Sequence, residues 1–458
     1  MNTSSLNPKT LLLPEYDKET SQHAVGWVKH NTAIMVVHGI GHQQPLETLD
    51  QFARGLVESY QQLFPGCIST AHKVQTIERD GEVAFQNVLQ ISHSDYPGRT
   101  IDLYEYYWAY CTQDKAGLTD INLWLQGVAK GAKKHYRHLN EDLGIRFQDE
   151  SLFFKNGKFV AWKYDLFLNF VVKAAILLNF IIELVLKVIG LVPFVGNIAQ
   201  SLLKKHFENR IHKLSNLVGD IVIYNVTDEK SRFFPVRKKI LDGATQTLQE
   251  LLERTEDNEL CYPSVVVAGH SLGSEIAYDA INRLNLLANT GKLKYYDQDG
   301  LAKQGFLEKG VPACLSEQLN GFITFGSPLD KIAFFLRQVV PENFYLWQQI
   351  VDHYHCFKQG AWTQTAAAHK LTGSSIKRLL DDIRWNNYYD SDDMVSGRLD
   401  YYVNLTNVEC RFNCLSQFSP KPSKFTHSHY WQCAYFYEDI IRNFLSPKNR
   451  ESENIQAA

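Results

Sequence analysis

The segment VVVAGHSLGSEIAYDAI, residues 265–281, restricts the fold of this chain more than any other stretch. An apolar run typical of a buried strand leads directly into Gly269-His270-Ser271-Leu272-Gly273, and a helical pattern follows at once. The two glycines permit a turn so sharp that larger side chains would collide with the adjoining strand and helix. A buried glycine-rich turn that serves packing alone is the competing interpretation, but it does not require serine at the apex. The pattern therefore predicts a strand–turn–helix unit that presents Ser271 as a nucleophile.

Strand-like and helix-like segments alternate along much of the chain, which predicts an α/β fold with a mostly parallel, doubly wound sheet. The predicted strands, several of them apolar enough to be covered on both faces, are 33–39, 99–109, 220–226, 264–270, 321–326, 385–390 and 402–412. The predicted helices are 46–63, 236–254, 274–287 and 330–340.

Two long stretches interrupt this alternation, so we expect one core with insertions. The expected sections are the N-terminal part of the core with an oxyanion loop (1–111), a large helical hydrophobic insertion or cap (112–217), the core with Ser271 (218–340), a second cap excursion (341–383) and the C-terminal part of the core with the acid and the histidine (384–458).

The first insertion contains an amphipathic helical pattern over residues 165–200. Its polar residues fall within an arc of about 120°, which leaves roughly two thirds of the circumference apolar. Three interpretations are open: a helix buried between cap and sheet, a lid or anchor that contacts a membrane surface peripherally, and a membrane span. Three charges within 173–187 disfavour the span, because each costs ~2.5–3.5 kcal/mol near a bilayer centre.

A serine hydroxyl attacks at neutral pH only when a base removes its proton and a carboxylate orients that base. Late in the chain, FTHSHYW (425–431) offers two candidate bases, His427 and His429. The loop after the strand 385–390 offers the acid from the group Asp390, Asp392 and Asp393, and Asp330 follows the preceding strand as an alternative.

Two backbone N–H groups are candidates for an oxyanion hole. The N–H of Leu272 lies at the amino end of the helix that follows Ser271. The second candidate is the N–H of Ile40, because the strand 33–39 ends in His38-Gly39 and glycine lets the chain approach a substrate closely. His38 and His42 are expected to orient this loop rather than to take part in chemistry.

The motifs HGIGHQQP, DLYEYYWA, VVVAGHSLGSEIAYDA, ITFGSPLDK and THSHYW resemble those of bacterial lipase-like serine hydrolases of the α/β-hydrolase superfamily. The resemblance extends over 33–63, 99–111, 218–340 and 384–445. It implies an α/β-hydrolase fold with Ser271 as nucleophile, His427 rather than His429 as base, and Asp393 as acid. Met394 departs from the family, which has proline at this position.

The resemblance, together with the hydrophobic insertion at 112–217, predicts a hydrolase that cleaves an acyl ester, with a lipid or phospholipid as the expected substrate. Such a mechanism needs no metal or organic cofactor. Cys410 and Cys414 are spaced too loosely for a typical zinc site with His427 and His429, and no metal is expected. The alternatives are a non-catalytic, membrane-associated scaffold of the same fold and a carboxylesterase or thioesterase for small soluble substrates.

The balance of charges and the N-terminal sequence indicate which partners and which cellular location to expect. Lys and Arg number 47 against 50 Asp and Glu, so no basic field favours a nucleic-acid partner. The first 20 residues lack the charged and apolar regions of a cleavable signal peptide. The expectation is a cytoplasmic protein, with 165–200 as the candidate segment for peripheral contact with a membrane.

Overall fold

The computed structural model describes residues 9–12, 25–113, 219–296, 315–330, 376–412 and 426–447 apart from short gaps, with isolated pieces within 115–166 and at 302–303 and 346. The chain divides into two compact units. One unit comprises 1–111, 238–332 and 342–458, and the other comprises 112–237 and 333–341.

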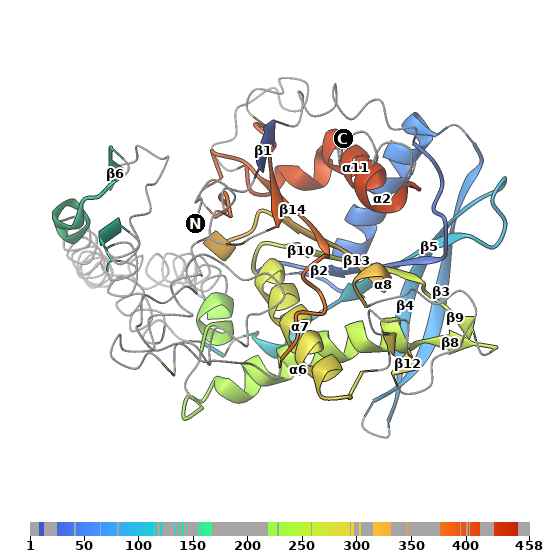
Figure 1. Cartoon of the computed structure of the whole chain (residues 1–458), viewed down its shortest axis with the longest axis horizontal. Coiled ribbons are helices and arrows are strands. Elements are labelled where there is room, and N and C mark those ends of the chain that lie inside the picture. The colour runs from blue at the N-terminus through green and yellow to red at the C-terminus, as the bar shows by residue number, and fades with distance from the viewer. Residues whose placement is uncertain are drawn as a thin grey trace, which may run out of the picture. The chain divides into compact units, whose positions relative to one another are not determined.

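The first unit is built around a mixed sheet that has nine strands among the described residues (Figure 1). In spatial order the strands are β1 (Lys9–Leu12), β15 (Leu405–Glu409), β14 (Arg384–Tyr389), β13 (Leu319–Phe325), β10 (Ser264–His270), β2 (Thr32–Val37), β5 (Thr100–Tyr106), β4 (Glu82–His93) and β3 (Ile68–Arg79). The pairs from β1 to β5 are parallel, whereas β4 and β3 form an antiparallel hairpin on the edge. The chain is therefore an α/β protein with a mostly parallel sheet.

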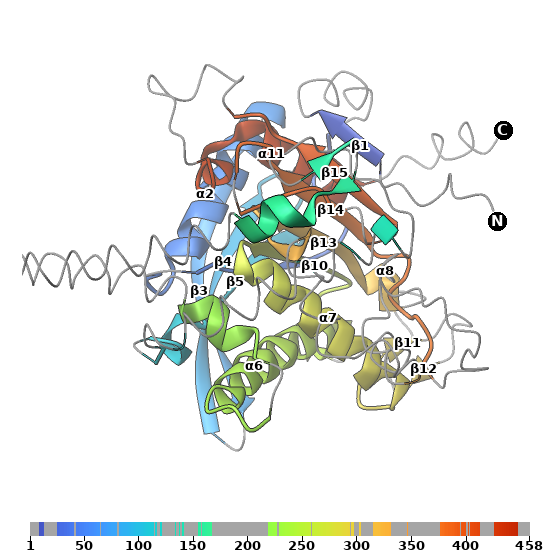
Figure 2. The same ribbon diagram turned by 90° about the vertical axis from the view of Figure 1, so that its left-hand side faces the viewer.

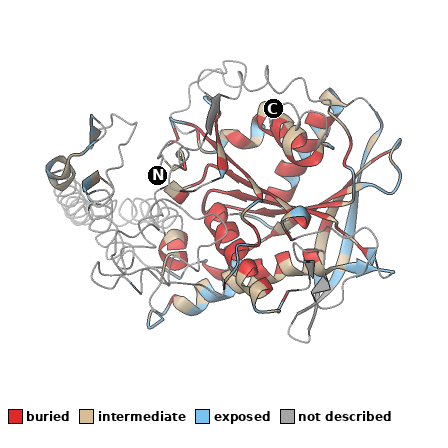
Figure 3. Cartoon of the chain, in the orientation of Figure 1, coloured by how far each residue is buried: buried red, intermediate tan, exposed pale blue. Residues whose placement is uncertain are grey.

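Helices cover both faces of this sheet. In Figures 1 and 2, α2 (Glu47–Leu63) and α11 (Ala434–Ile440) lie on one face, and α6 (Phe234–Glu253) and α7 (Leu272–Asn289) lie on the other. β2 and β10 are buried along their whole length, as expected of central strands covered on both faces. Figure 3 shows the buried residues gathered in these strands and on the helix surfaces against them.

The described residues also form shorter elements. These include η2 (Ala109–Cys111), the ribbons β6–β7 (Phe154–Lys155 and Lys158–Phe159), β8–β9 (Thr255–Glu256 and Glu259–Leu260) and β11–β12 (Tyr295–Tyr296 and Ala302–Lys303), α8 (Leu315–Gln318), η5 (His429–Gln432) and η6 (Ile441–Leu445).

Most predicted core strands and helices occur within a few residues of their expected bounds, but one strand prediction is wrong. Residues 219–224 are helical, although 220–226 reads as a strand. The prediction also omitted β1 and the hairpin of β3 and β4. The predicted helix 330–340 lies almost entirely outside the described residues.

The apolar stretch 165–200, apart from its first two residues, and the second cap excursion, apart from Leu346 and the residues from 376 onward, lie outside the described residues. Among the residues that the structure does describe, none of the helices is long and apolar enough to cross a membrane. The three interpretations of 165–200 therefore stay open.

Candidate active site

Ser271 occupies the sharp turn between β10 and α7. Its backbone has φ 52° and ψ −129°, a positive-φ conformation outside the left-handed helical region that costs an ordinary residue about 1–3 kcal/mol and persists only where its surroundings enforce it. The Ser271 N–H donates to the carbonyl of Phe325 at 3.1 Å, and the Ser271 carbonyl accepts from the N–H of Ser274 at 2.9 Å. The first bond holds the turn against the neighbouring strand β13, and the second closes the turn onto the start of α7.

Both glycines of the turn sit where a side chain has no room. A Cβ atom at Gly273 would lie 2.3 Å from the carbonyl oxygen of Val37, and one at Gly269 would lie 2.6 Å from the Cα atom of Ser274. The obstacles are backbone atoms, which cannot rotate away. The turn predicted from the GHSLG sequence is therefore present, and its tightness brings the start of α7 against the end of β2.

The residues of the two candidate oxyanion donors lie near Ser271, Leu272 next to it in the sequence and Ile40 in the loop after β2. Leu272 is the first residue of α7, where backbone N–H groups have no partner within the helix. Gly39 lies so close that a Cβ atom there would be 2.6 Å from the Cβ atom of Ser271. Ile40 follows Gly39 directly, so the loop after β2 passes beside the serine.

His38 is a structural part of this loop. Its Nδ1 donates to the carbonyl of Gly39 at 2.8 Å, and its Nε2 accepts from the N–H of Trp108 at 3.0 Å. Its ring also stacks on the Trp108 indole, with centroids 4.9 Å apart. Burial lowers the pKa of His38 to about 4, against the opposing effect of the Gly39 bond, so its ring is neutral near pH 7. His42 lies outside the described residues.

His427 and Asp393 meet, although 34 residues separate them in the chain. The Nδ1 atom of His427 lies 2.8 Å from Oδ2 of Asp393. The same carboxylate oxygen accepts the Tyr430 hydroxyl at 3.2 Å, and Oδ1 accepts the N–H of Val395 at 2.9 Å. The Asp393 side chain is 1% exposed and that of His427 is 12% exposed. The carboxylate is thus fixed from several sides while the imidazole keeps some access to solvent.

The pKa of Asp393 reflects two opposing effects. Burial alone would raise it, but the hydrogen bond and charge of His427, with bonds from Val395 and Ser396, lower the pKa to about 2. Asp393 is therefore ionised throughout the neutral range and can stabilise a positive charge on His427.

The other acid candidates are engaged elsewhere. Asp390 is fully buried and accepts the N–H groups of Asp392 at 2.7 Å and Phe412 at 2.6 Å, so it caps backbone turns; burial raises its pKa. Asp330 lies close to Gly397, in the loop after β14. A Cβ atom at Gly397 would be 2.2 Å from Oδ2 of Asp330. Neither carboxylate is the one that meets the ring of His427.

His429 also lies away from this contact. It begins the short helix η5, and its ring packs against Phe412 with centroids 5.7 Å apart. Of the two late histidines, His427 is the one that bonds Asp393.

Ser271 and His427 are brought to the same region without being hydrogen-bonded. A Cβ atom at Gly326, next to Phe325, would lie 3.0 Å from Cε1 of His427 and 3.2 Å from Nε2 of His270. The Ser271 hydroxyl oxygen is buried and has no hydrogen-bond partner in the described part of the chain. Such bonds are often loose in a free enzyme and tighten only with substrate.

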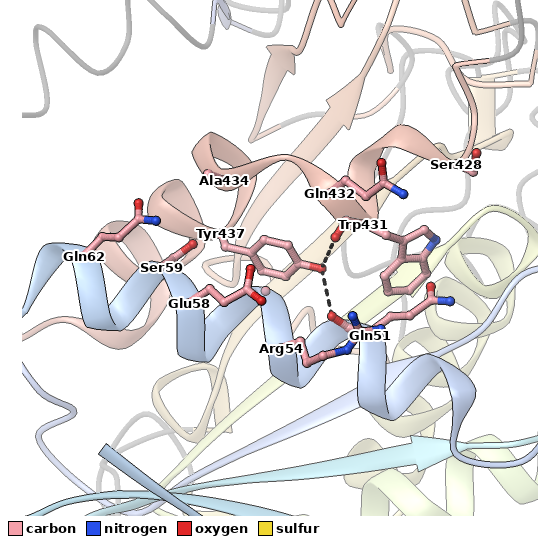
Figure 4. A pocket seen from close by; sticks show the side chains of 11 residues that line it. Gln51, Arg54, Glu58, Ser59, Gln62, Ser428, Trp431, Gln432, Ala434 and Tyr437 are labelled. Atoms are coloured by element: carbon pink, nitrogen blue, oxygen red, sulfur yellow. Dashed lines mark hydrogen bonds between the residues drawn. The ribbon is translucent and has the colours of Figure 1, made fainter. Parts of the chain in front are cut away.

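A pocket of about 460 Å³ lies beside the His427 segment, between α2 and the η5–α11 region (Figure 4). It is lined by Gln51, Arg54, Gly55, Glu58, Ser59, Gln62, Ser428, Trp431, Gln432, Ala434 and Tyr437. The hydroxyl of Tyr437, one of the lining residues, lies within hydrogen-bonding distance of the carbonyl oxygens of Trp431 at 3.3 Å and Gln51 at 3.5 Å. The walls are mostly polar, so this pocket does not supply the apolar surface that a long acyl chain requires.

Sequence reasoning did not find the roles of Trp108, Gly326 and Tyr430. Tyr430 stands within the quoted motif THSHYW, but its bond to Asp393 depends on a contact over 37 residues. Among the described residues, no group of three His, Cys, Asp or Glu side chains could hold a metal ion.

Fold and site together define an α/β protein in which a strained serine, a buried carboxylate–imidazole pair and a close-packed glycine loop converge at the ends of parallel strands. The chain matches no protein-family model, and comparisons with curated proteins and with solved structures found no match.

Proposed function

We propose that this chain is a serine hydrolase of the α/β-hydrolase superfamily that cleaves acyl esters. The observation that carries the proposal is the bond between His427 and Asp393, formed beside a turn that holds Ser271 at a positive φ. Packing alone does not account for a strained serine next to a carboxylate-oriented imidazole.

In the proposed reaction, Ser271 Oγ attacks the ester carbonyl carbon while Nε2 of His427 takes the hydroxyl proton. Asp393 keeps the Nδ1–H tautomer and stabilises the imidazolium. The N–H groups of Leu272 and Ile40 donate to the oxyanion. The imidazolium returns the proton to the leaving alcohol, and a water molecule then releases the acyl group by the same path.

A lipid or phospholipid is the proposed substrate class, and the argument for it is the apolar stretch 165–200. A wide apolar helix face can receive acyl chains or contact a membrane surface. A series of esters of increasing chain length, assayed with and without lipid vesicles, tests this part. Preference for short soluble esters together with no vesicle binding would favour a carboxylesterase or thioesterase.

Labelling with a fluorophosphonate probe tests the nucleophile. We expect the wild-type chain to be labelled at Ser271 and Ser271→Ala to show no labelling. Ser69→Ala, which removes an exposed hydroxyl on β3, should label as the wild type does. A folded wild-type chain that never labels would instead support the non-catalytic scaffold.

A further inference from the structure

His270 precedes Ser271 and is a buried titratable side chain near the site. Side chains alternate between the faces of a strand, so Val266, Ala268 and His270 of β10 share one face. Val266 and Ala268 belong to the core cluster that includes α2 and α11 residues. The imidazole of His270 therefore lies on the α11 side of the sheet, beneath the segment that carries His427.

The His270 ring touches that segment directly. Its Nε2 lies 3.3 Å from the backbone oxygen of His427, and the centroids of the two rings are 4.9 Å apart. Phe325 and Trp431 pack against it, each with a centroid distance of 5.0 Å. A Cβ atom at Gly39 would lie 3.1 Å from its Nδ1. One ring thus fills the space between the oxyanion loop and the histidine segment.

The protonation state of His270 is fixed by its surroundings. Burial, followed by the proximity of His427, lowers the pKa of His270 to about 3. The ring is therefore neutral at neutral pH and carries one N–H. A carbonyl oxygen can only accept a hydrogen bond, so the proton lies on Nε2 and is donated to His427. A neutral ring at this place also adds no repulsion when His427 becomes charged.

We propose that His270 is a positioning residue, which fixes the His427 backbone relative to Ser271 by a hydrogen bond to the His427 carbonyl. This inference rests on the proposed hydrolase function. Because His270 and Ser271 share a peptide bond, the nucleophile and the anchor of its base move together. Asp393 then sets the orientation of the imidazole, and His270 sets the position of the chain that carries it. A displacement of about 1 Å in such a site costs on the order of 10²-fold in rate.

The test compares His270→Phe, which keeps a ring but removes the donor, with His270→Gln, whose amide N–H can reach the same carbonyl. We expect His270→Phe to lower kcat by about 10²-fold with KM changed less than about threefold. His270→Gln should recover most of the loss. Trp431→Phe, which disturbs the same packing without touching the hydrogen bond, serves as the control and should stay within about fivefold of wild type. Equal losses in the Phe and Gln variants, or no loss in the Phe variant, would overturn the proposal.

A second readout does not depend on hydrolysis. The Nδ1 proton of His427, bonded to Asp393, should give a low-field proton resonance that disappears in Asp393→Asn. We expect His270→Phe to shift or broaden this resonance and His270→Gln to restore it. If fluorophosphonate labelling of the wild type fails but the resonance responds in this way, the proposed function falls and the positioning role stands. An unchanged resonance in folded His270→Phe overturns the positioning role.

Discussion

At the scale of single residues, the difference between Asp393 and its neighbour Asp390 is decided by what each carboxylate touches. Asp393 bonds the imidazole of His427, whereas the Asp390 oxygens accept backbone N–H groups. Both lie in one loop and are buried. Their chemistry therefore differs although their exposure does not.

We expect Asp393→Asn to lower kcat by about 10³–10⁴-fold, because an amide no longer fixes the Nδ1–H tautomer or balances the imidazolium charge; the magnitude follows the precedent of Ser-His-Asp enzymes. Asp390→Asn should leave kcat within about tenfold and act mainly on the free energy of unfolding. Steady-state ester hydrolysis by both purified variants checks this. Near-normal turnover in Asp393→Asn would contradict the role of Asp393 as the acid and point to another carboxylate.

Gly326 is a second position where a single added Cβ atom should affect the site, and Gly98 offers a matched control. Both have positive φ, 59° and 80°, but a Cβ atom at Gly326 would meet His427 and His270, whereas one at Gly98 meets nothing within 4 Å. Each alanine substitution should therefore cost about 1–2 kcal/mol of stability from backbone strain. Only Gly326→Ala should also lower kcat, by about tenfold or more, since it displaces His427. Urea unfolding and kcat measured on both variants separate these effects, and equal kcat in the two would contradict the contact.

Only the part of the candidate site that is formed by residues close in sequence could be predicted from sequence patterns alone. The GHSLG turn depends on neighbours in the chain, so Ser271, Gly269 and Gly273 were identifiable from their spacing. The choice of His427 and Asp393 came from resemblance, and their bond spans 34 residues. The anchoring of His38 by Trp108 spans 70 residues and left no periodic signal.

At the scale of elements, the packing of α7 against β2 depends on Gly273. A Cβ atom at Gly273 would lie 2.3 Å from the carbonyl oxygen of Val37 and 2.5 Å from that of His38. We expect Gly273→Ala to destabilise the fold by at least about 2–3 kcal/mol, because the helix must shift away from backbone that cannot yield. Ser274→Ala, which removes only the hydroxyl bond to the Gly269 carbonyl, should cost about 1 kcal/mol. Thermal unfolding of both variants gives the comparison, and equal costs would show that the turn can relax.

Two errors of prediction at this scale have different causes. The apolar, β-branched run at 220–226 favours a strand by propensity. In the structure Val222 and Ile223 are part of a helix and pack with Phe233, so tertiary contacts outweigh the strand propensity. The hairpin of β3 and β4, by contrast, carries Asp80-Gly81 between strands paired from Arg79↔Glu82 onward. Asp-Gly is a strong turn signal between strands, so the local sequence does contain the information that indicates this hairpin.

At the scale of the molecule, burial predicts where the fold opens first. β2 and β10 are fully buried between parallel partners, while β3 forms the outer edge of the sheet and exposes Val74. Native-state hydrogen exchange should therefore be slowest in β2 and β10 and faster by at least about 10²-fold in the outer part of the hairpin. Peptide-resolved mass spectrometry measures this, and uniform protection across the sheet would contradict the expected gradient.

The Asp393–His427 pair should make the free energy of unfolding of the whole fold depend on pH in the acid range. The pKa of Asp393 is lowered to about 2 in the folded chain, below an unfolded value of about 3.9. A depressed carboxyl pKa stabilises the fold above the unfolded value, and that stabilisation is lost as the pH falls from about 4 to 2. Asp393→Asn has no such titration, so its stability deficit relative to wild type should shrink on acidification by on the order of 1 kcal/mol. Urea unfolding of both chains between pH 6 and pH 3 measures the difference, in which the titrating groups that do not interact with Asp393 cancel. A deficit that is constant over this range would mean that the pair contributes no pH-dependent stability.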